Sequence, residues 1–222
     1  MGGSAQSQGR EVAVRTSWPV LAAAATLLVM LASRNVLAQS LTPQPPGPLA
    51  LDIRGTTLGV PQTSDFYPDL PGDTIVPARG FGLEAGVHFY PWARGARSLG
   101  VGADLFWTRA SATPTINSST ADGTVTGIAL PDVAVTMVVV SPQASINFGT
   151  SRGWSYLTVG GGAARVRSAA ASDTLTRSVG DINTGGGARW FITDHLGVGF
   201  DLRLHWIGGS TLFAASAGFS LK

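Results

Sequence analysis

This 222-residue chain contains three histidines, the residue type that takes part in the widest range of chemical reactions: His88, His195 and His205. Histidine binds metal ions and acts as a general base, but a metal site needs two or three ligands that converge on one point. The strand order predicted from the sequence puts His88 and His195 near one rim of the fold and His205 near the other. We therefore predict no metal site and no cofactor, and the absence of cysteine excludes a thiolate site.

His205 has the sequence neighbours that a Ser–His–acid catalytic set would need, because Asp201 and Ser210 lie close to it. Two glycine runs, at 160–162 and 185–187, would suit phosphate binding only if each preceded a helix. Both runs lie inside alternating stretches that are typical of strands, so packing space or bulges explain them better. We predict no catalytic residue and no enzyme activity from these patterns.

The charged residues that normally cover a water-soluble domain are scarce. Asp, Glu, Lys and Arg make up 13% of the chain, against about 25% in ordinary soluble domains. Lys222 is the only lysine, Glu11 and Glu84 are the only glutamates, and 44% of the residues are hydrophobic. This composition disfavours both a soluble enzyme domain and an intrinsically disordered chain.

The first forty residues differ in character from the rest. Two arginines precede the apolar run 18–32, and Val36 and Ala38 stand at the −3 and −1 positions of a cleavage site. This order predicts a signal peptide at 1–38, cleaved after Ala38, and a Pro-rich linker at 39–47; an uncleaved anchor is the alternative. Removing 1–38 leaves 12 basic and 12 acidic residues, so the basic excess that a nucleic-acid partner would require is lost.

Beyond residue 47 the hydrophobic residues recur with a period of two, which places them on one face of a β-strand. In 196–206 every even position is apolar, while the odd positions carry glycine, Asp201, Arg203 and His205. Eight such stretches of about ten residues match the number and length of the strands in a small transmembrane barrel. The predicted strands are 49–56, 81–89, 99–107, 138–148, 155–166, 182–192, 196–206 and 210–222.

The lengths of the connections and the positions of tryptophan agree with a barrel over 48–222. Three connections are short, namely 92–96, 149–153 and 193–195. Three others are long and polar, namely 59–79, 110–131 and 168–178, whereas the last one, around 207–209, is short. Outer-membrane barrels combine short periplasmic turns with long outer loops and an aromatic girdle. The predicted girdle comprises Trp92, Trp107, Trp154, Trp190 and Trp206.

We therefore predict an all-β fold, an eight-stranded antiparallel up-and-down transmembrane β-barrel with a filled polar lumen. With a tight turn at 193–195, Gly185 faces Arg203 and Gly187 faces Asp201. A similar turn at 92–96 puts Glu84 beside Asp104, and we expect Arg189 or Arg203 to reach across the lumen and neutralise this pair. The predicted lumen network comprises Glu84, His88, Asp104, Arg189, Asp201, Arg203 and His205.

Arg165 and Arg167 have the parity of the outward face near the outer rim. In that position they would contact lipopolysaccharide phosphates. A bulge at the glycines of 160–162 would instead turn both side chains inward, and the sequence leaves the two arrangements open.

The chain resembles the small bacterial outer-membrane β-barrel family of the OmpA and OmpX type over about 48–222. The resemblance rests on the meander of alternating strands and on the segments 156–162, 185–191 and 201–205. It implies a monomer in a Gram-negative outer membrane, in contact with membrane lipid and lipopolysaccharide and inserted by the outer-membrane assembly machinery. That machinery reads the last strand, which usually ends in an aromatic residue; here Phe219 is followed by Ser220, Leu221 and Lys222.

The predicted function is a structural or surface-interaction role through the connections 59–79 and 110–131. Three alternatives belong to other classes: a narrow pore, a lipid A-modifying barrel enzyme, and a secreted soluble lipocalin-like barrel. Eight strands leave an interior that side chains fill, which disfavours the pore. A lipid A deacylase would use His205, but Ile207 occupies the position of that family's serine. The soluble barrel would need Lys and Glu on an outer surface that has almost none.

Overall fold

The computed structural model describes residues 47–70, 74–113, 115–119, 125–129 and 132–222. The predicted signal peptide and residues 39–46 of the predicted linker lie outside the described residues. Among the described residues, no helix is long and apolar enough to cross a membrane.

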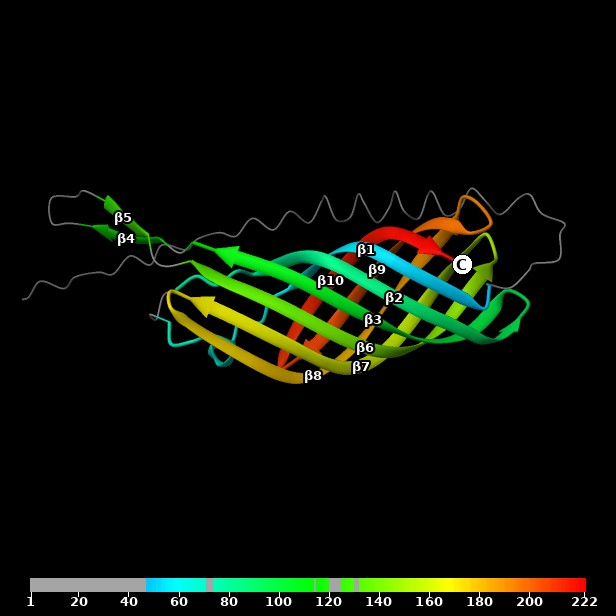
Figure 1. The fold of residues 1–222 in the computed structure, drawn as a ribbon, viewed down its shortest axis with the longest axis horizontal. Helices are drawn as coiled ribbons and strands as arrows, with labels where there is room; N and C mark the ends of the chain where they lie inside the picture. The colour runs from blue at the N-terminus through cyan, green and yellow to red at the C-terminus, as the bar shows by residue number, and fades with distance from the viewer. Residues whose placement is uncertain (1–46, 71–73, 114, 120–124, 130–131) are drawn as a thin grey trace, which may run out of the picture. The chain divides into compact units, whose positions relative to one another are not determined.

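Eight antiparallel strands close into a barrel in which neighbours along the chain are neighbours in the sheet (Figure 1). Strand β1 pairs with β2 on one side and with β10 on the other, so the sheet has no free edge. All eight predicted strands are present, including 49–56, and the predicted fold is confirmed. The barrel strands are β1 (Leu49–Gly59), β2 (Arg79–Arg94), β3 (Arg97–Ala112), β6 (Val133–Thr150), β7 (Gly153–Ala170), β8 (Asp173–Phe191), β9 (Leu196–Ile207) and β10 (Ser210–Leu221).

Over most of its length the barrel wall is apolar outside and polar inside. Ile53, Leu157 and Phe219 point outward and are 64%, 63% and 61% exposed. On the inward face of the same β1 strand, Asp52 and Arg54 are buried. A continuous apolar outer wall of this kind is stable in lipid and would be a large exposed patch in water. The protein is therefore a transmembrane barrel, and the soluble lipocalin-like alternative is wrong.

The two ends of the barrel carry different connections. At one end, the turn end, the strands are joined by the short segments 95–96, 151–152 and 192–195. At the other end, the loop end, the connections are 60–78, 113–132, 171–172 and 208–209. The first of these contains the 3-10 helix η2 (Ser64–Phe66). The second contains a separate two-stranded sheet of β4 (Thr115–Ser119) and β5 (Val125–Ala129).

The predicted long connection at 168–178 is wrong. Strands β7 and β8 continue through this segment, with Arg167 paired to Thr176, and they meet in a two-residue turn at Ala171 and Ser172. Backbone pairing does not require apolar side chains, so serine, threonine and arginine extend the ladder beyond the apolar part of the wall. The polar composition of 168–178 therefore marks the strand ends and not a loop.

The predicted register holds for one hairpin and fails for another. In β8–β9, Gly185 lies opposite Arg203 and Gly187 opposite Asp201, as predicted. In β2–β3, Asp104 lies opposite Gly86, whereas Glu84 lies opposite Phe106. The turn at 95–96 pairs Arg94 with Arg97, and the register then shifts by one residue between Phe89 and Trp92. The resulting pairing differs by two residues from the turn that the sequence suggested.

The inward face changes from polar to apolar along the barrel. On β6, Gln143 and Asn147 point inward toward the turn end, whereas Met137 and Val135 point inward toward the loop end. The interior therefore has two layers, which we call the ionic layer and the apolar layer. The ionic layer comprises Asp52, Arg54, Glu84, His88, Asp104, Arg189, Asp201 and Arg203. The apolar layer comprises Leu58, Val60, Phe66, Tyr67, Phe106, Val133, Val135, Met137, Val139, Ala164, Val166, Ala170, Ile207, Leu212 and Ala214.

Candidate functional site: the closed barrel interior

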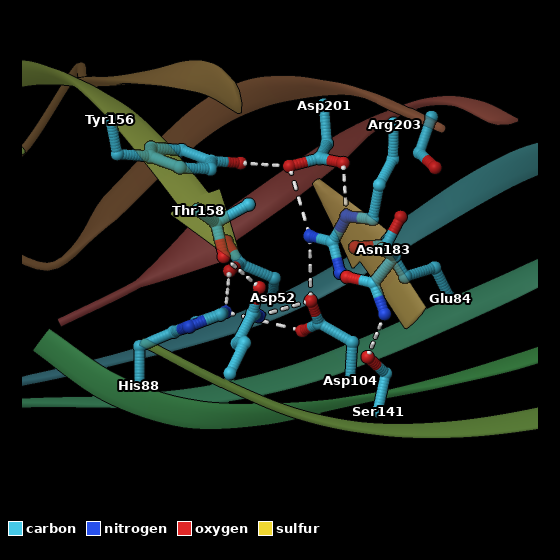
Figure 2. Close-up of polar contacts among 12 residues, drawn as sticks. Asp52, Glu84, His88, Asp104, Ser141, Tyr156, Thr158, Asn183, Asp201 and Arg203 are labelled. Carbon is cyan, nitrogen blue, oxygen red and sulfur yellow. Dashed lines mark hydrogen bonds and ion pairs between the residues drawn. The ribbon is translucent and has the colours of Figure 1, made fainter. Parts of the chain in front are cut away.

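The structure places all seven residues of the predicted lumen network inside the barrel. Each is at least 96% buried, and the charged groups of the interior come from the five strands β1, β2, β3, β8 and β9. Figure 2 shows how Asp52, Asp104 and Asp201 lie among them. Inward orientation follows from strand alternation, since each of these residues occupies the polar parity of its strand. They do not form one continuous cluster: His205 lies apart, and the other six join Asp52 and Arg54.

Asp52 on β1 binds the largest number of these groups. Arg189 on β8 donates from Nε to Asp52 Oδ1 at 3.0 Å and from Nη2 to Oδ2. Arg54 Nη2 lies 2.9 Å from Oδ1, and His88 Nε2 lies 3.1 Å from Oδ2. Ser220 Oγ on β10 also donates to Oδ1, at 2.5 Å. A buried carboxylate with this many donors is compensated for the water it has lost.

Asp104 on β3 forms the second centre of the ionic layer. Arg203 Nη2 on β9 lies 2.8 Å from Asp104 Oδ2, and the Nε of Arg203 lies 3.1 Å from Asp201 Oδ1. Gln143 donates to Asp104, and the Tyr156 hydroxyl donates to Asp201 at 2.8 Å. These contacts connect opposite walls of the barrel through side chains (Figure 2).

Glu84 and Asp104 are both neutralised by arginine, as predicted, but each carboxylate has its own arginine. Arg203 reaches across the lumen to Asp104, whereas Arg54 on the neighbouring strand binds Glu84, with 2.8 Å between Nη1 and Oε1. Arg189, the other candidate, binds Asp52. Asp52 and Arg54 were absent from the predicted network, although the sequence already places both on one face of 49–56.

His205 is fully buried and contacts other side chains of the barrel interior. Its Nδ1 lies 3.0 Å from Asp181 Oδ1, and its ring packs edge-on against Phe106 with 5.2 Å between ring centroids. The carboxylate beside it is therefore Asp181, and Asp201 is occupied by Arg203 and Tyr156. The Ser–His–acid arrangement considered for Asp201, His205 and Ser210 is wrong, because burial and these pairings leave His205 no serine partner among the contacts of the described residues.

The histidines do not converge. His88 lies between Asp52 and Asp104, and His195 is exposed in the 192–195 turn, where Nδ1 is 3.2 Å from the Lys222 carbonyl oxygen. Within the described part of the chain, no group of three His, Cys, Asp or Glu side chains is arranged to hold a metal ion.

Glycine creates the space that the ionic layer occupies. A Cβ added at Gly86 would lie 2.3 Å from Asp104 Oδ1, and one at Gly187 would lie 2.7 Å from the Tyr156 hydroxyl. Both distances are too short for a carbon atom, so a side chain at these positions would displace Asp104 or its neighbour in the lumen, Tyr156. The glycines of 185–187 thus provide packing space within a strand, and they do not bind phosphate in the manner of a helix-capping loop.

The apolar layer closes the barrel toward the loop end, and the sequence did not predict it. Phe66 and Tyr67, from the 60–78 connection, fold into the barrel mouth and are 3% and 7% exposed. Ser168 Oγ on β7 donates to the Phe66 carbonyl at 2.6 Å, and the Tyr67 hydroxyl donates to the Pro61 carbonyl at 2.7 Å. Burial raises the pKa of Tyr67 to about 12. The adjacent aromatic residues Phe66 and Tyr67 within the connection were the available signal.

Four of the five predicted girdle tryptophans point outward, and one does not. Trp92, Trp107, Trp190 and Trp206 are between 39% and 48% exposed on the outer wall. Trp154 is 2% exposed and packs inside against Tyr90 and Phe191, so its assignment to the girdle is wrong. Its parity explains the difference: Leu157 and Val159 point outward on β7, and an even-numbered residue on that strand points inward.

Arg165 and Arg167 are exposed on the outward face of β7 near the loop end. The glycines of 160–162 introduce no shift in pairing with β8, where Gly161 lies opposite Ile182 and Arg165 opposite Ser178. The inward arrangement that the sequence left open is therefore not adopted.

No protein-family model matches the chain, and no curated protein matches it in sequence. Its fold is similar to that of Ail, the attachment invasion locus protein of Yersinia pestis, with a TM-score of 0.52 and 12% identity over 79% of this chain and 98% of Ail. A second Ail structure, in complex with the heparin analogue sucrose octasulfate, gives a TM-score of 0.51 and 12% identity over 78% of this chain and 96% of that one. Neisserial surface protein A matches with a TM-score of 0.48 and 12% identity over 79% of this chain and 97% of that protein.

At this level of identity the likeness concerns the fold. The chain has the fold of the small eight-stranded outer-membrane β-barrels.

Proposed function

We propose that this protein is a closed, non-catalytic barrel of the bacterial outer membrane that displays its loop-end connections for surface interaction. The observation that carries the proposal is the combination of a filled interior with long connections at one end only. The ionic layer and the apolar layer both occupy the lumen, whereas 60–78 and 113–132 extend the chain beyond the barrel strands.

Two stacked layers of different polarity favour a closed barrel over a pore. A hydrated ion would have to separate buried ion pairs in one layer and then cross an apolar layer that contains Phe66 and Tyr67. We expect no regular conductance steps when the refolded protein is inserted into a planar lipid bilayer. Regular single-channel steps that are absent from protein-free bilayers would overturn the closed-barrel proposal in favour of the pore.

The chain contains no cysteine, so a single introduced cysteine can be labelled specifically to test surface display. In intact cells, a membrane-impermeant maleimide should label Thr126→Cys, which lies in β5 of the 113–132 connection. The matched control is Asp194→Cys in the exposed 192–195 turn, which should be labelled only after the outer membrane is permeabilised. Labelling of position 194 but not 126 in intact cells would reverse the orientation and contradict the proposal.

The β4–β5 segment is assigned to display and not to support of the barrel. Replacing 114–131 by a Gly-Gly turn should leave membrane insertion unchanged. Boiled and unboiled samples of this variant should differ in gel mobility as those of the wild type do. The barrel strands pair with one another without β4 and β5, which form their own sheet. Loss of folding in this variant would show instead that the segment has a structural role.

We also propose that residues 1–38 direct export and are removed after Ala38. The support is the order of arginines, apolar run and small residues in that segment. Intact-mass measurement of protein extracted from outer membranes should give a chain that begins at Gln39. A mass that retains 1–38 would establish the uncleaved anchor.

A further inference from the structure

An arginine cluster lies on the outward wall at the loop end. It comprises Arg109 on β3 and Arg165 and Arg167 on β7, all exposed. Thr136 on β6 lies between them, because its Cα pairs with Arg109 on one side and with Arg167 on the other. At an interstrand spacing of 4.7–4.9 Å, the Cα atoms of Arg109 and Arg167 are about 10 Å apart, so the two long side chains can converge on one anion above Thr136.

The cluster has no acidic partner on the wall that carries it. On the described barrel strands β3, β6, β7 and β8, each Asp or Glu either points into the barrel or is the first residue of its strand. No ion pair involves these three arginines within the described ranges, whereas Arg54, Arg189 and Arg203 are all paired inside. The charge of the cluster is therefore available to a ligand outside the barrel.

The cluster also borders the apolar wall directly. Trp107 lies two residues from Arg109 on the same face of β3, and the Cα of Val138 pairs with Trp107 and with Arg165. A ligand that fills this site must present an anionic group beside hydrocarbon. Arginine binds phosphate through two parallel hydrogen bonds, and cationic side chains at a membrane surface attract phosphorylated lipids.

The cluster is restricted to one side of the barrel. The outward positions of β1, β9 and β10 carry no Lys or Arg among the described residues. Arg79 on β2 is outward too, but its guanidinium lies over the Phe213 ring, 5.9 Å from the centroid, and contacts Thr57. The arrangement thus forms a local site and not a uniform cationic belt.

We propose that Arg109, Arg165 and Arg167 bind the phosphates of a lipopolysaccharide molecule in the outer leaflet, with its acyl chains along Trp107 and the apolar wall below. This inference rests on the proposed outer-membrane orientation, which places the loop end at the outer leaflet. It extends the predicted contact of Arg165 and Arg167 to a third arginine on another strand, which only the register of β3, β6 and β7 brings alongside.

The test compares lipid A with its dephosphorylated form, each titrated onto the folded protein and measured by native mass spectrometry. The wild type should retain lipid A and bind the dephosphorylated lipid far more weakly. The variant Arg109→Gln/Arg165→Gln/Arg167→Gln should lose roughly a hundredfold in affinity for lipid A. Each of the three cations contributes a similar part of the electrostatic attraction to the lipid phosphates, and the variant loses all three. Replacement of all three by lysine should recover part of this affinity, because charge remains while the bidentate geometry is lost.

The matched control is Arg94→Gln/Arg97→Gln/Arg152→Gln, which removes three exposed arginines from the turn end. This control should retain lipid A as the wild type does. Equal retention of both lipids by the wild type, or unchanged retention by the loop-end variant, would overturn the proposal. Tight binding of soluble sucrose octasulfate in place of lipid A, dependent on the same arginines, would assign the site to a soluble anion and also overturn it.

The two proposals fail in different ways. If labelling at position 126 and position 194 follows the expected pattern while lipid A retention does not depend on the cluster, the outer-membrane orientation stands and only the lipid site is wrong. If position 194 is labelled in intact cells, the orientation itself is wrong.

Discussion

Arg203 on β9 and Asp104 on β3 form an ion pair across the full width of the barrel, with 2.8 Å between Nη2 and Oδ2. The two strands are four places apart in either direction around the eight-stranded sheet. Both side chains are fully buried, so neither charge has an alternative partner in water. The pair therefore holds opposite walls together and helps to fill the lumen.

Removing one member of this pair should be more damaging than removing both. We expect Asp104→Leu or Arg203→Met alone to lower the free energy of unfolding by about 3–5 kcal/mol, because each removes one charge from the buried network and leaves its former partner only partly compensated. The double variant should lose clearly less than the sum of the two single losses. Urea titration of the refolded protein in lipid vesicles measures all three values. Additive losses would mean that the pair is not energetically coupled.

The contact between Phe66 and the β9–β10 turn predicts different effects for two adjacent glycines. Gly208 and Gly209 have φ angles of 53° and 83°, so alanine at either position costs about 1 kcal/mol in backbone strain. A Cβ at position 208 would also lie 2.4 Å from Phe66 Cζ, whereas one at position 209 meets no atom within 4 Å.

Gly208→Ala should therefore destabilise the protein by about 1–3 kcal/mol more than Gly209→Ala. The excess should disappear when Phe66 is replaced by alanine in both variants, because the crowded ring is then absent. The unfolding free energies of the four proteins provide the measurement. An equal effect of the two glycine substitutions would contradict the position of Phe66 in the barrel mouth.

Tyr67 predicts a loss of stability at high pH. Its pKa is raised to about 12 in the folded protein, against about 10 for an exposed tyrosine. The stabilisation that neutral Tyr67 provides is complete below pH 10 and is lost as the pH rises toward 12, at up to about 1.4 kcal/mol per pH unit. Docking of the 60–78 connection should weaken over the same interval.

The difference in tyrosinate ultraviolet absorbance between the wild type and Tyr67→Phe isolates the titration of this one side chain. We expect its midpoint near 12. The Tyr67→Phe variant should also show a smaller decrease in unfolding free energy above pH 10 than the wild type does. A difference titration centred near the ordinary value of about 10 would show that Tyr67 is exposed.

The division of tryptophans between wall and lumen is open to a spectroscopic test. Variants that keep a single tryptophan, with the others replaced by phenylalanine, are refolded into vesicles of lipids with brominated acyl chains. Fluorescence of Trp107 and Trp206 should be strongly quenched, since both rings face lipid. Trp154 should keep most of its emission because it is enclosed by Tyr90 and Phe191. Quenching of Trp154 to the level of Trp206 would show that Trp154 faces lipid and belongs to the girdle.

The sequence by itself determined the number of barrel strands, which face of each is apolar, and which ends of these strands carry the long connections at 60–78 and 113–132. These features depend on local alternation, because consecutive side chains of a strand must point to opposite faces. It also predicted the opposition of Gly185 to Arg203, since a short turn leaves few registers for the two strands that it joins. The shortage of lysine and glutamate has the same local origin: one face of each strand meets lipid and the other meets a small lumen. The sequence did not predict the separate β4–β5 sheet within 113–132.

Only the tertiary structure decided which charges meet and how the barrel is sealed. The irregularity between Phe89 and Trp92 moves Asp104 opposite Gly86, and closure of the sheet then brings Arg203 to Asp104 and Arg189 to Asp52. Folding of Phe66 into the mouth likewise depends on the shape of the walls around it. These contacts join residues far apart in sequence, and their geometry follows from the closure and stagger of the whole sheet, which no local pattern of residues specifies.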